Sequence, residues 1–369
     1  MTGRASGRSR AGDADGTGDA GGTGERVSAE RLRRLATAVL GGHGVPGDDA
    51  ALVADVLVEA NLRGHDSHGV ARLPRICEGL GLGAIRPVAC VETVRDGGAA
   101  VLLDGRRSLG PVAGVVAADR AVRRAAEHGL GVVGMRGASH LGMIGYYAER
   151  IAVAGMIGLV LTNSEPAMAP YGGAERKLGT NALALGFPTG AEPILVDMST
   201  SVAARGKIMV AQRRGESIPP GWAVDADGAD TTDPAAALDG ALQAMAGAKG
   251  YCLAVAVDLL TGALTGGGVG SEVSGTFDMR RPSNKGDLLV AARPEALAGD
   301  GVFLDGAGRL MEDLRSARTR PGVAEILLPG EVERRTRTAR LVSGVEVDPR
   351  LLDELRELAE PTRRRHGRP

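Results

Sequence analysis

Apolar side chains in the first part of the chain recur at helical spacing. Ser28 is a typical helix N-cap, and the apolar residues of 29–42 fall on one helical face. A second amphipathic helix is predicted over residues 46–62, and a third, short helix follows residues 68–69. The segment 28–95 is therefore expected to be mainly helical.

From about residue 99 onward, short apolar runs alternate with longer amphipathic ones, which is typical of an α/β layered sheet. The polar stretch 215–235 is predicted to be a long loop. We expect residues 96–330 to form the α/β part, and residues 331–369, with a helix over 348–361, to join the helical part. Strands are predicted at 99–105, 130–137, 156–164, 183–188, 194–200, 287–297 and 324–331, and the intervening helices at 111–129, 141–155, 202–215 and 249–266.

The first 27 residues are polar and glycine-rich, with almost no apolar content. Such a segment buries too little surface to offset the entropy of ordering, so residues 1–27 are expected to be a disordered tail. They also lack the apolar core of a secretory signal. Residues 28–369 are then expected to form one domain.

Charge and composition exclude several classes of function. The 369 residues carry 44 Lys+Arg against 45 Asp+Glu, so the basic surface of a typical nucleic-acid binder is not expected. No apolar run approaches the length of a membrane span. Three widely spaced cysteines are typical of reduced thiols, and we expect a cytoplasmic protein.

One glycine pattern, residues 129–134, matches the GxGxxG fingerprint of dinucleotide binding. The fingerprint requires its glycines after a strand and at the start of a helix, where backbone amides face the pyrophosphate. Here the glycines precede and occupy the predicted strand. The pattern is therefore not expected to bind a nucleotide in the Rossmann manner.

The segment 63–72 (RGHDSHGVAR) gathers two of the six histidines with a hydroxyl, a carboxylate and two arginines. His68 and Arg72 are four residues apart, so they project to one side if a helix begins here. An imidazole beside a guanidinium suits proton transfer to a substrate that is held by its carboxylate. A solvated turn and a metal site formed by His65, Asp66 and His68 are the alternatives. With no further histidine or thiol nearby, we expect no metal.

Three further segments carry candidate binding groups at the ends of predicted strands. His140 lies in residues 137–142, where a strand gives way to a helix whose free amides suit a phosphate. Residues 179–181 and 197–201 offer hydroxyls and amides, and Asp197 could accept hydrogen bonds from a ribose. Ordinary turn and N-cap chemistry explains the same residue types.

Six motifs, in order from about residue 28 to residue 358, resemble the type 2 malate/L-lactate dehydrogenase family. This family includes ureidoglycolate and sulfolactate dehydrogenases and the piperideine/pyrroline-2-carboxylate reductases. The resemblance implies a three-layer α/β/α fold with a mixed sheet, a helical N-terminal part and non-Rossmann dinucleotide binding, usually in a homodimer. The motifs are RGHDSHGVARLP, GASHLGMIGYY, GTNALALGFP, ILVDMSTSVAARGKI, IPPGWAVDADG…TTDP and KGYCLAVAVDLLTGALTG.

The resemblance also implies roles for individual residues. Ser67 and His68 match a hydroxyl and a proton-transferring histidine, Arg72 matches a clamp for the substrate carboxylate, and Lys207 is placed with the catalytic residues. His140 matches a cofactor contact and is the alternative acid/base. The other matches are substrate contacts at Thr180, Arg205 and Gly206, and cofactor contacts at Leu141, Gly142, Met143, Ile144, Asp197, Met198, Ser199, Lys249, Pro329, Gly330 and Glu331.

The expected activity is hydride transfer between NAD or NADP and C2 of a small 2-hydroxy/2-oxo acid, with His68 as the proton donor during reduction. The alternative is NADPH-dependent reduction of a cyclic imino acid. Lys207 favours the hydroxy acid slightly, because the imine reductases have a carboxylate at this position. A non-catalytic relative that binds a nucleotide or metabolite is a further class. Lys285 has no expected role; it lies in Asn284–Asp287, where many relatives have a Gly-His ending.

Overall fold

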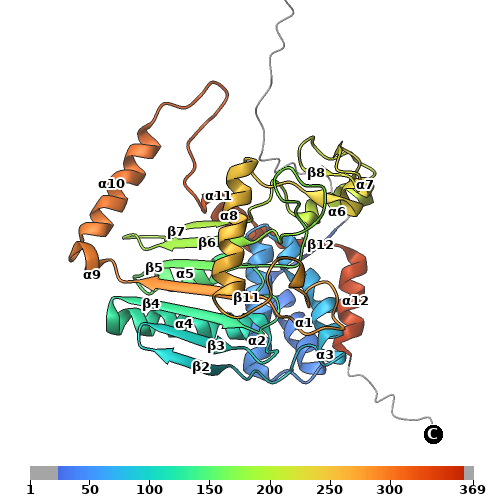
Figure 1. The fold of residues 1–369 in the computed structure, drawn as a ribbon, viewed down its shortest axis with the longest axis horizontal. Coiled ribbons are helices and arrows are strands. Elements are labelled where there is room, and N and C mark those ends of the chain that lie inside the picture. Colours follow the sequence, from blue (N-terminus) through green and yellow to red (C-terminus); the bar gives the residue numbers. More distant parts are fainter. Residues whose placement is uncertain (1–23, 361–369) are drawn as a thin grey trace, which may run out of the picture.

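A seven-stranded mixed sheet dominates the computed structural model, which describes residues 24–360 (Figure 1). β3 and β4 are parallel, and every other neighbouring pair is antiparallel. The sequence prediction of an α/β protein with a mixed sheet is thus confirmed. In sheet order the strands are β2 (Glu92–Gly97), β3 (Ala100–Asp104), β4 (Leu130–Arg136), β11 (Gly286–Ala292), β5 (Ile157–Thr162), β6 (Ala182–Phe187) and β7 (Ile194–Met198).

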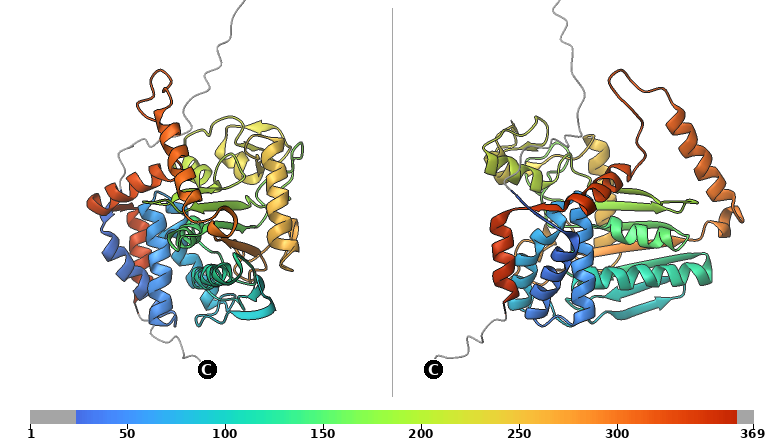
Figure 2. Two further views of the ribbon diagram at one scale, coloured as in Figure 1. Left: turned by 90° about the vertical axis from the view of Figure 1, so that its left-hand side faces the viewer. Right: turned by 180° about the vertical axis from the view of Figure 1, so that it is seen from behind.

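Helices pack on both faces of this sheet (Figure 2). Alternate side chains of a strand point to opposite faces. Leu289 of β11 therefore joins the core beneath α4 (Gly110–His128) and α5 (Gly145–Val153). The adjacent Leu288 instead packs with Val257 of α8 (Ala248–Asp258), and a π-helical turn, η3, continues this helix.

A second core lies among helices beside the sheet. Ser28 caps α1, since its hydroxyl accepts a hydrogen bond from the amide of Arg31 at 3.3 Å, as the N-cap prediction requires. The predicted second and third helices are also present. The helices of this group are α1 (Ala29–Gly42), α2 (Gly47–Leu62), α3 (Leu73–Gly81), α11 (Glu331–Ser343) and α12 (Pro349–Ala359).

Regular structure begins three residues before Ser28. β1 (Glu25–Val27) pairs antiparallel with β12 (Val345–Val347), so the prediction of a tail as far as residue 27 is wrong for these three residues. Local composition could not reveal this strand, because its partner lies at the other end of the chain. The rest of the predicted tail, residues 1–23, and the terminal residues 361–369 lie outside the described residues.

Two predicted strands differ from the structure. β11 ends at Ala292, because Pro294 cannot continue the ladder and α9 (Glu295–Ala298) follows. Residues 324–331 form no strand. There the amide of Leu328 donates to the carboxylate of Glu331 at 2.7 Å instead of to a neighbouring strand.

The predicted loop 215–235 contributes to a small unit beside the sheet. β8 (Ala223–Val224) and β9 (Asp230–Thr231) pair within it, and β10 (Ala241–Leu242) completes a three-stranded sheet. α6 (Arg205–Arg214) and α7 (Pro234–Asp239) pack together beside this sheet.

The glycines of the GxGxxG pattern have packing roles. Gly129 ends α4 in a left-handed conformation, with φ 81°, and Gly131 lies inside β4. A Cβ at Gly131 would come within 2.1 Å of the Ala121 carbonyl oxygen, so this glycine lets α4 approach the sheet. The glycines precede and occupy the strand, as the sequence indicated.

α10 (Val302–Ser316) projects away from the sheet and buries none of its residues (Figure 1). The apolar pattern of the sequence does not predict this helix. Within residues 24–360, no helix is long and apolar enough to cross a membrane.

Candidate active site

The turn that carries His68 is held by its neighbours in space. It consists of two short 3-10 helices, η1 (Asp66–His68) and η2 (Val70–Arg72). Asn61, at the end of α2, donates to the Asp66 carboxylate at 2.7 Å and accepts from the Val70 amide at 2.9 Å. Arg340 of α11 binds the same carboxylate with two nitrogens, at 2.8 and 3.1 Å. Asp66 is thus a structural anchor rather than a free carboxylate.

Ser67, His68 and Arg72 lie together on this turn. The Ser67 hydroxyl is 3.0 Å from His68 Nδ1, and Arg72 Nε donates to the Ser67 carbonyl oxygen at 2.8 Å. This bond leaves the two terminal nitrogens of Arg72 available. Arg72 forms no ion pair with any described carboxylate.

His140 reaches the same place from the end of β4. The Ser139 hydroxyl accepts from the Gly110 amide at 2.8 Å, and this bond joins the His140 turn to α4. The Gly142 amide donates to His140 Nδ1 at 2.9 Å, so the neutral ring carries its proton on Nε2. The ring centroids of His140 and His68 are 5.5 Å apart. Both predicted acid/base candidates therefore face one site.

Burial and nearby positive charge keep both imidazoles neutral. Burial, followed by the charge of Arg72, lowers the pKa of His68 to about 3. The same two causes hold the pKa of His140 well below its usual value. Burial, with the charge of Arg75, lowers the pKa of Arg72 to about 10, so Arg72 remains charged at neutral pH. The site is therefore positive and suits an anion.

Asp197 lies at the end of β7 and faces the start of α5. Its Oδ2 accepts from the Gly145 amide at 2.8 Å, and a Cβ at Gly145 would lie only 2.6 Å from this oxygen. Burial raises the pKa of Asp197 to about 7. A half-buried carboxylate with one protein donor has acceptor capacity for ribose hydroxyls, so this group fits a nicotinamide nucleotide.

Of the predicted substrate contacts, Gly206 is the residue that the structure places against the turn. Gly206, in the first turn of α6, is so close that a Cβ there would lie 3.2 Å from the Cβ of Ser67. Arg205 lies with its guanidinium 5.8 Å from the ring centre of Phe277. Thr180 lies just before β6, where its carbonyl oxygen accepts from the Thr200 amide at 2.9 Å.

The predicted cofactor contacts are dispersed along the site. Leu141, Met143 and Ile144 are buried, so on this turn only their backbone can face a ligand. Met198 is exposed and Ser199 bonds to the Ser201 hydroxyl.

The Pro329–Glu331 segment lies beside β7, since a Cβ at Gly330 would lie 3.1 Å from the Leu195 carbonyl oxygen. It therefore borders the strand that carries Asp197.

Lys207 and Lys249 are exposed, at the starts of α6 and α8. Neither forms an ion pair with a described residue, and no contact joins them to the two histidines. Their assigned roles stay predictions. The described part of the chain also contains no cluster of three His, Cys, Asp or Glu side chains that could hold a metal ion.

Sequence reasoning missed several residues of the site. Asn61 and Arg340 hold the turn, and neither belongs to a recognisable motif. Lys285, for which the sequence predicts no role, binds Asp287, with Nζ 2.6 Å from Oδ2, and both side chains are buried.

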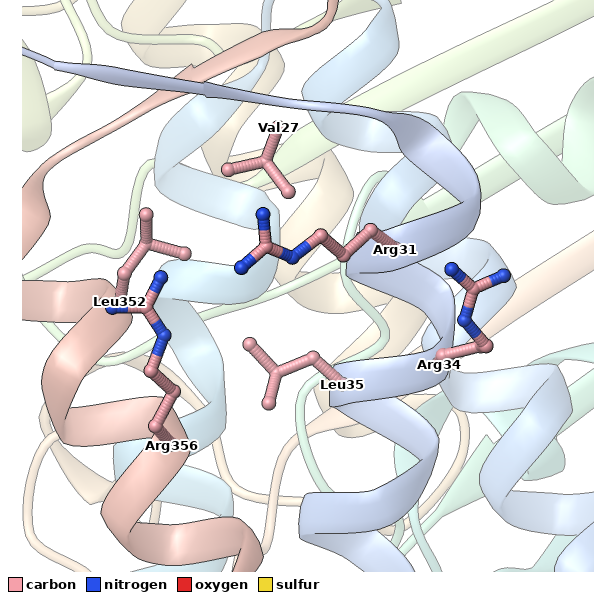
Figure 3. A pocket seen from close by; sticks show the side chains of 6 residues that line it. All are labelled: Val27, Arg31, Arg34, Leu35, Leu352 and Arg356. Carbon is pink, nitrogen blue, oxygen red and sulfur yellow. The ribbon is translucent and has the colours of Figure 1, made fainter.

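A cavity beside Arg72 and His140 is lined on its polar side by Arg72, Arg75, Ser139, His140, Gly142 and Thr276. A larger one, of about 310 Å³, lies between α1 and α12, away from the histidines (Figure 3). The arginines of the larger cavity, Arg31, Arg34 and Arg356, all pair with carboxylates. The arginines beside His140 do not, which distinguishes the two cavities.

Known proteins resemble nearly all of the described chain. The model of a family described as malate/L-lactate dehydrogenase matches residues 27–356. An L-sulfolactate dehydrogenase of Methanocaldococcus jannaschii is 41% identical over 332 residues, which is 90% of this chain and 96% of the relative. The solved structure of that organism's sulfolactate dehydrogenase, at the same identity and coverage, has a TM-score of 0.86.

Two relatives carry other names. A ureidoglycolate dehydrogenase (NAD(+)) of Escherichia coli K12 is 34% identical over 324 residues, which is 87% of this chain and 92% of the relative. The structure of a Δ1-piperideine-2-carboxylate reductase of Pseudomonas syringae has 29% identity and a TM-score of 0.81, covering 90% of this chain and 99% of that one.

Proposed function

Since the chain belongs to the malate/L-lactate dehydrogenase family, we propose that the turn over residues 66–72 and His140 form its site of hydride transfer. The chain is an oxidoreductase that moves a hydride between NAD or NADP and C2 of a small 2-hydroxy or 2-oxo acid. One observation carries the assignment of the site: two neutral imidazoles lie 5.5 Å apart beside an arginine without a carboxylate partner.

Arg72 binds the substrate carboxylate in this proposal. Its Nε is engaged by the Ser67 carbonyl oxygen, and its terminal nitrogens can donate to both oxygens of a carboxylate. Such a pair fixes the orientation of the acid and holds C2 near the imidazoles. It also neutralises the charge that lowers the pKa of His68, so the bound substrate raises the pKa of its own proton donor.

The neutral ring of His68, which the free site favours, is the base that accepts the 2-hydroxyl proton during oxidation, and the protonated ring is the acid during reduction. Ser67 lies 3.0 Å from Nδ1 and orients the ring, leaving Nε2 for the substrate oxygen. The proton lost by His68 goes to the developing alkoxide at C2. His140, which carries its proton on Nε2, donates a hydrogen bond on the other side of the site.

The nucleotide is held, in this proposal, by Asp197 and by the amides of the turn before α5. The nicotinamide supplies or accepts the hydride when bound. The carboxylate of Asp197 accepts ribose hydroxyls, and the Pro329–Glu331 segment borders the same strand. Residues 129–134 take no part, because their glycines lie at the end of α4 and inside β4. We therefore infer that the binding mode is not that of a Rossmann fold.

The test is a panel of 2-oxo acids and of piperideine-2-carboxylate with NADH and NADPH, applied to the wild type and to His68→Ala and His140→Ala. We expect turnover of 2-oxo acids, with His68→Ala losing about 1000-fold in kcat. His140→Ala should lose less. Loss of kcat in His140→Ala alone would assign the acid to His140, and preferred turnover of the imine would establish the alternative reaction.

We also propose a homodimer and a cytoplasmic location. α10 has an apolar stripe that includes Leu310, exposed to 53%, and Leu314, exposed to 41%, and no residue of this helix is buried. A stripe of this kind needs a partner surface, and a second copy of the chain supplies one. The cytoplasmic proposal rests on the three cysteines, which are all free.

A further inference from the structure

Arg75 and Arg205 contact Phe277, on the loop before β11, and neither these two arginines nor Arg72 forms an ion pair with a described carboxylate. Arg75 of α3 donates to the Phe277 carbonyl oxygen, and Arg205 of α6 lies 5.8 Å from the centre of its ring. Arg72 is close enough that the charge of Arg75 contributes to lowering its pKa, after burial. One substrate carboxylate bound to Arg72 would leave Arg75 uncompensated.

The carboxylate of Glu165, which contacts this loop, is already engaged. Glu165 accepts from the amides of Thr276 and Phe277, at 2.6 and 3.0 Å, and so anchors the loop tip. It makes no ion pair with Arg75 or Arg72. Asp278, the next carboxylate along the loop, pairs with Arg280 at 2.7 Å. The positive charge of Arg75 therefore faces the cavity.

The Thr276 hydroxyl gives independent evidence of a ligand. Thr276 is only 4% exposed, and its hydroxyl has no hydrogen-bond partner among the described residues. It lines the same cavity as Arg75, Arg72 and His140. A buried hydroxyl without a hydrogen-bond partner is destabilising. A bound acceptor would remove this destabilisation.

Apolar side chains line the cavity together with these polar groups. They include Leu57, Ile76, Ile85 and Met279. Little water can screen a charge there, so an anionic group that enters must be held by protein donors. Arg75 and Thr276 line the same cavity as Arg72 and His140 and can supply these donors.

We propose that Arg75 and the Thr276 hydroxyl bind a second anionic group of the substrate, so that the enzyme selects 2-hydroxy and 2-oxo acids bearing a distal carboxylate or sulfonate. Arg72 binds the C1 carboxylate, and His68 acts at C2 between the two anionic ends. The inference rests on the proposed site of hydride transfer and adds a specificity-determining pair to it. Singly charged acids bind Arg72 alone and leave Thr276 unsatisfied.

The test compares oxaloacetate and sulfopyruvate with pyruvate, in the wild type, Arg75→Gln, Thr276→Val and the control Arg280→Gln. Arg280 is on the same loop, with 81% of its side chain exposed. We expect Arg75→Gln to lower the ratio of kcat/KM for oxaloacetate to that for pyruvate by about 100-fold, mainly through KM. Thr276→Val should lower it about 10-fold, and Arg280→Gln should not change it. An unchanged ratio in both Arg75→Gln and Thr276→Val overturns the inference.

A binding measurement separates this inference from the proposed function. The rise in Tm with malate and with lactate is measured for the wild type and both variants without nucleotide. We expect malate to give the larger rise in the wild type, and this excess to vanish in Arg75→Gln. If no 2-oxo acid is reduced but the excess depends on Arg75, the proposed function fails and the anion site stands. If malate and lactate act alike, the site is refuted whatever the activity. Thr276→Val decides the matter if Arg75→Gln does not fold.

Discussion

Gly69 packs directly against the side chain of Asn61: a Cβ at Gly69 would lie 2.1 Å from Asn61 Oδ1. That oxygen accepts from the Val70 amide, and the amide nitrogen of Asn61 donates to Asp66. A single side chain of α2 therefore fixes both halves of the turn, on either side of Gly69. The φ of Gly69 is −88°, which any residue can adopt, so the backbone does not require glycine here. The contact with Asn61 requires it instead, and the position of His68 depends on that contact.

Gly69→Ala should therefore displace Asn61 and the turn. We expect a loss of stability of about 2 kcal/mol and a fall in kcat of about 100-fold, because His68 and Arg72 move relative to His140. Denaturant unfolding and steady-state kinetics measure the two effects.

Gly41→Ala is the matched control. Nothing lies within 4 Å of a Cβ at Gly41, which is in the helix α1, so this variant should gain about 0.5–1 kcal/mol. Equal behaviour of the two variants would show that the contact with Asn61 does not hold the turn.

Asp197→Asn tests the raised pKa of Asp197. The folded-state pKa is about 7 and the ordinary value is 3.8, so the folded protein binds more protons between these pH values. This carboxyl group therefore lowers the stability of the wild type as pH rises through that window. The asparagine oxygen can still accept from the Gly145 amide. We expect the stability of the variant relative to the wild type to increase by about 2 kcal/mol from pH 5 to pH 8.

Denaturant unfolding at both pH values measures this difference. Although its relative stability rises, the variant should bind the nucleotide less well than the wild type. At pH 8, where the wild-type carboxylate is ionised, the KM for the nucleotide should be higher in the variant. A stability difference that does not change with pH would mean that Asp197 titrates near its ordinary value.

Much of the proposed site is predictable from the sequence because His68 and Arg72 share one contiguous turn. Most strands and helices were likewise predictable, since their apolar periodicity is local. Arg340 was not, because it binds Asp66 from 274 residues away. The same limit applies to Arg75: its lack of an acidic partner is a property of the folded surroundings, which no sequence spacing reveals.

α10 was missed for a different reason. Its apolar stripe has helical spacing, but glycines interrupt it and no core residue of the same chain packs against it. At residues 324–331 the error is the opposite one: an apolar run predicts a strand that the structure does not contain. This segment passes beside the edge strand β7 without pairing with it, because the Leu328 amide donates to Glu331 instead.

Lys285 and Asp287 form a buried ion pair at the start of β11, with exposed fractions of 2% and 0%. Lys285→Met would leave the carboxylate of Asp287 buried without a counter-charge, at a cost of about 3–5 kcal/mol. The double variant Lys285→Met/Asp287→Leu removes both charges and should recover most of this loss. Unfolding free energies of the single and double variants form the test, and a double variant no more stable than Lys285→Met would refute the coupling.

An anionic substrate analogue should raise the pKa of His68. Arg72 is the second cause of its low value of about 3, after burial, and a carboxylate bound to Arg72 offsets that charge. NMR titration of the His68 ring, with and without oxamate, measures the change. In Arg72→Gln we expect a higher starting pKa and little response to oxamate. An unaltered titration in the wild type would place the analogue away from Arg72.

Replacing the apolar stripe of α10 tests the homodimer. Leu310→Glu/Leu314→Glu puts two carboxylates on a surface that the proposal covers with a second copy of the chain. Because α10 buries no residue within its own chain, the variant should fold with an unchanged circular dichroism spectrum but sediment as a monomer. Arg309→Glu, an exposed charge on the same helix, is the control and should retain the wild-type mass. Equal masses for wild type and double variant would mean that α10 is not the dimer contact.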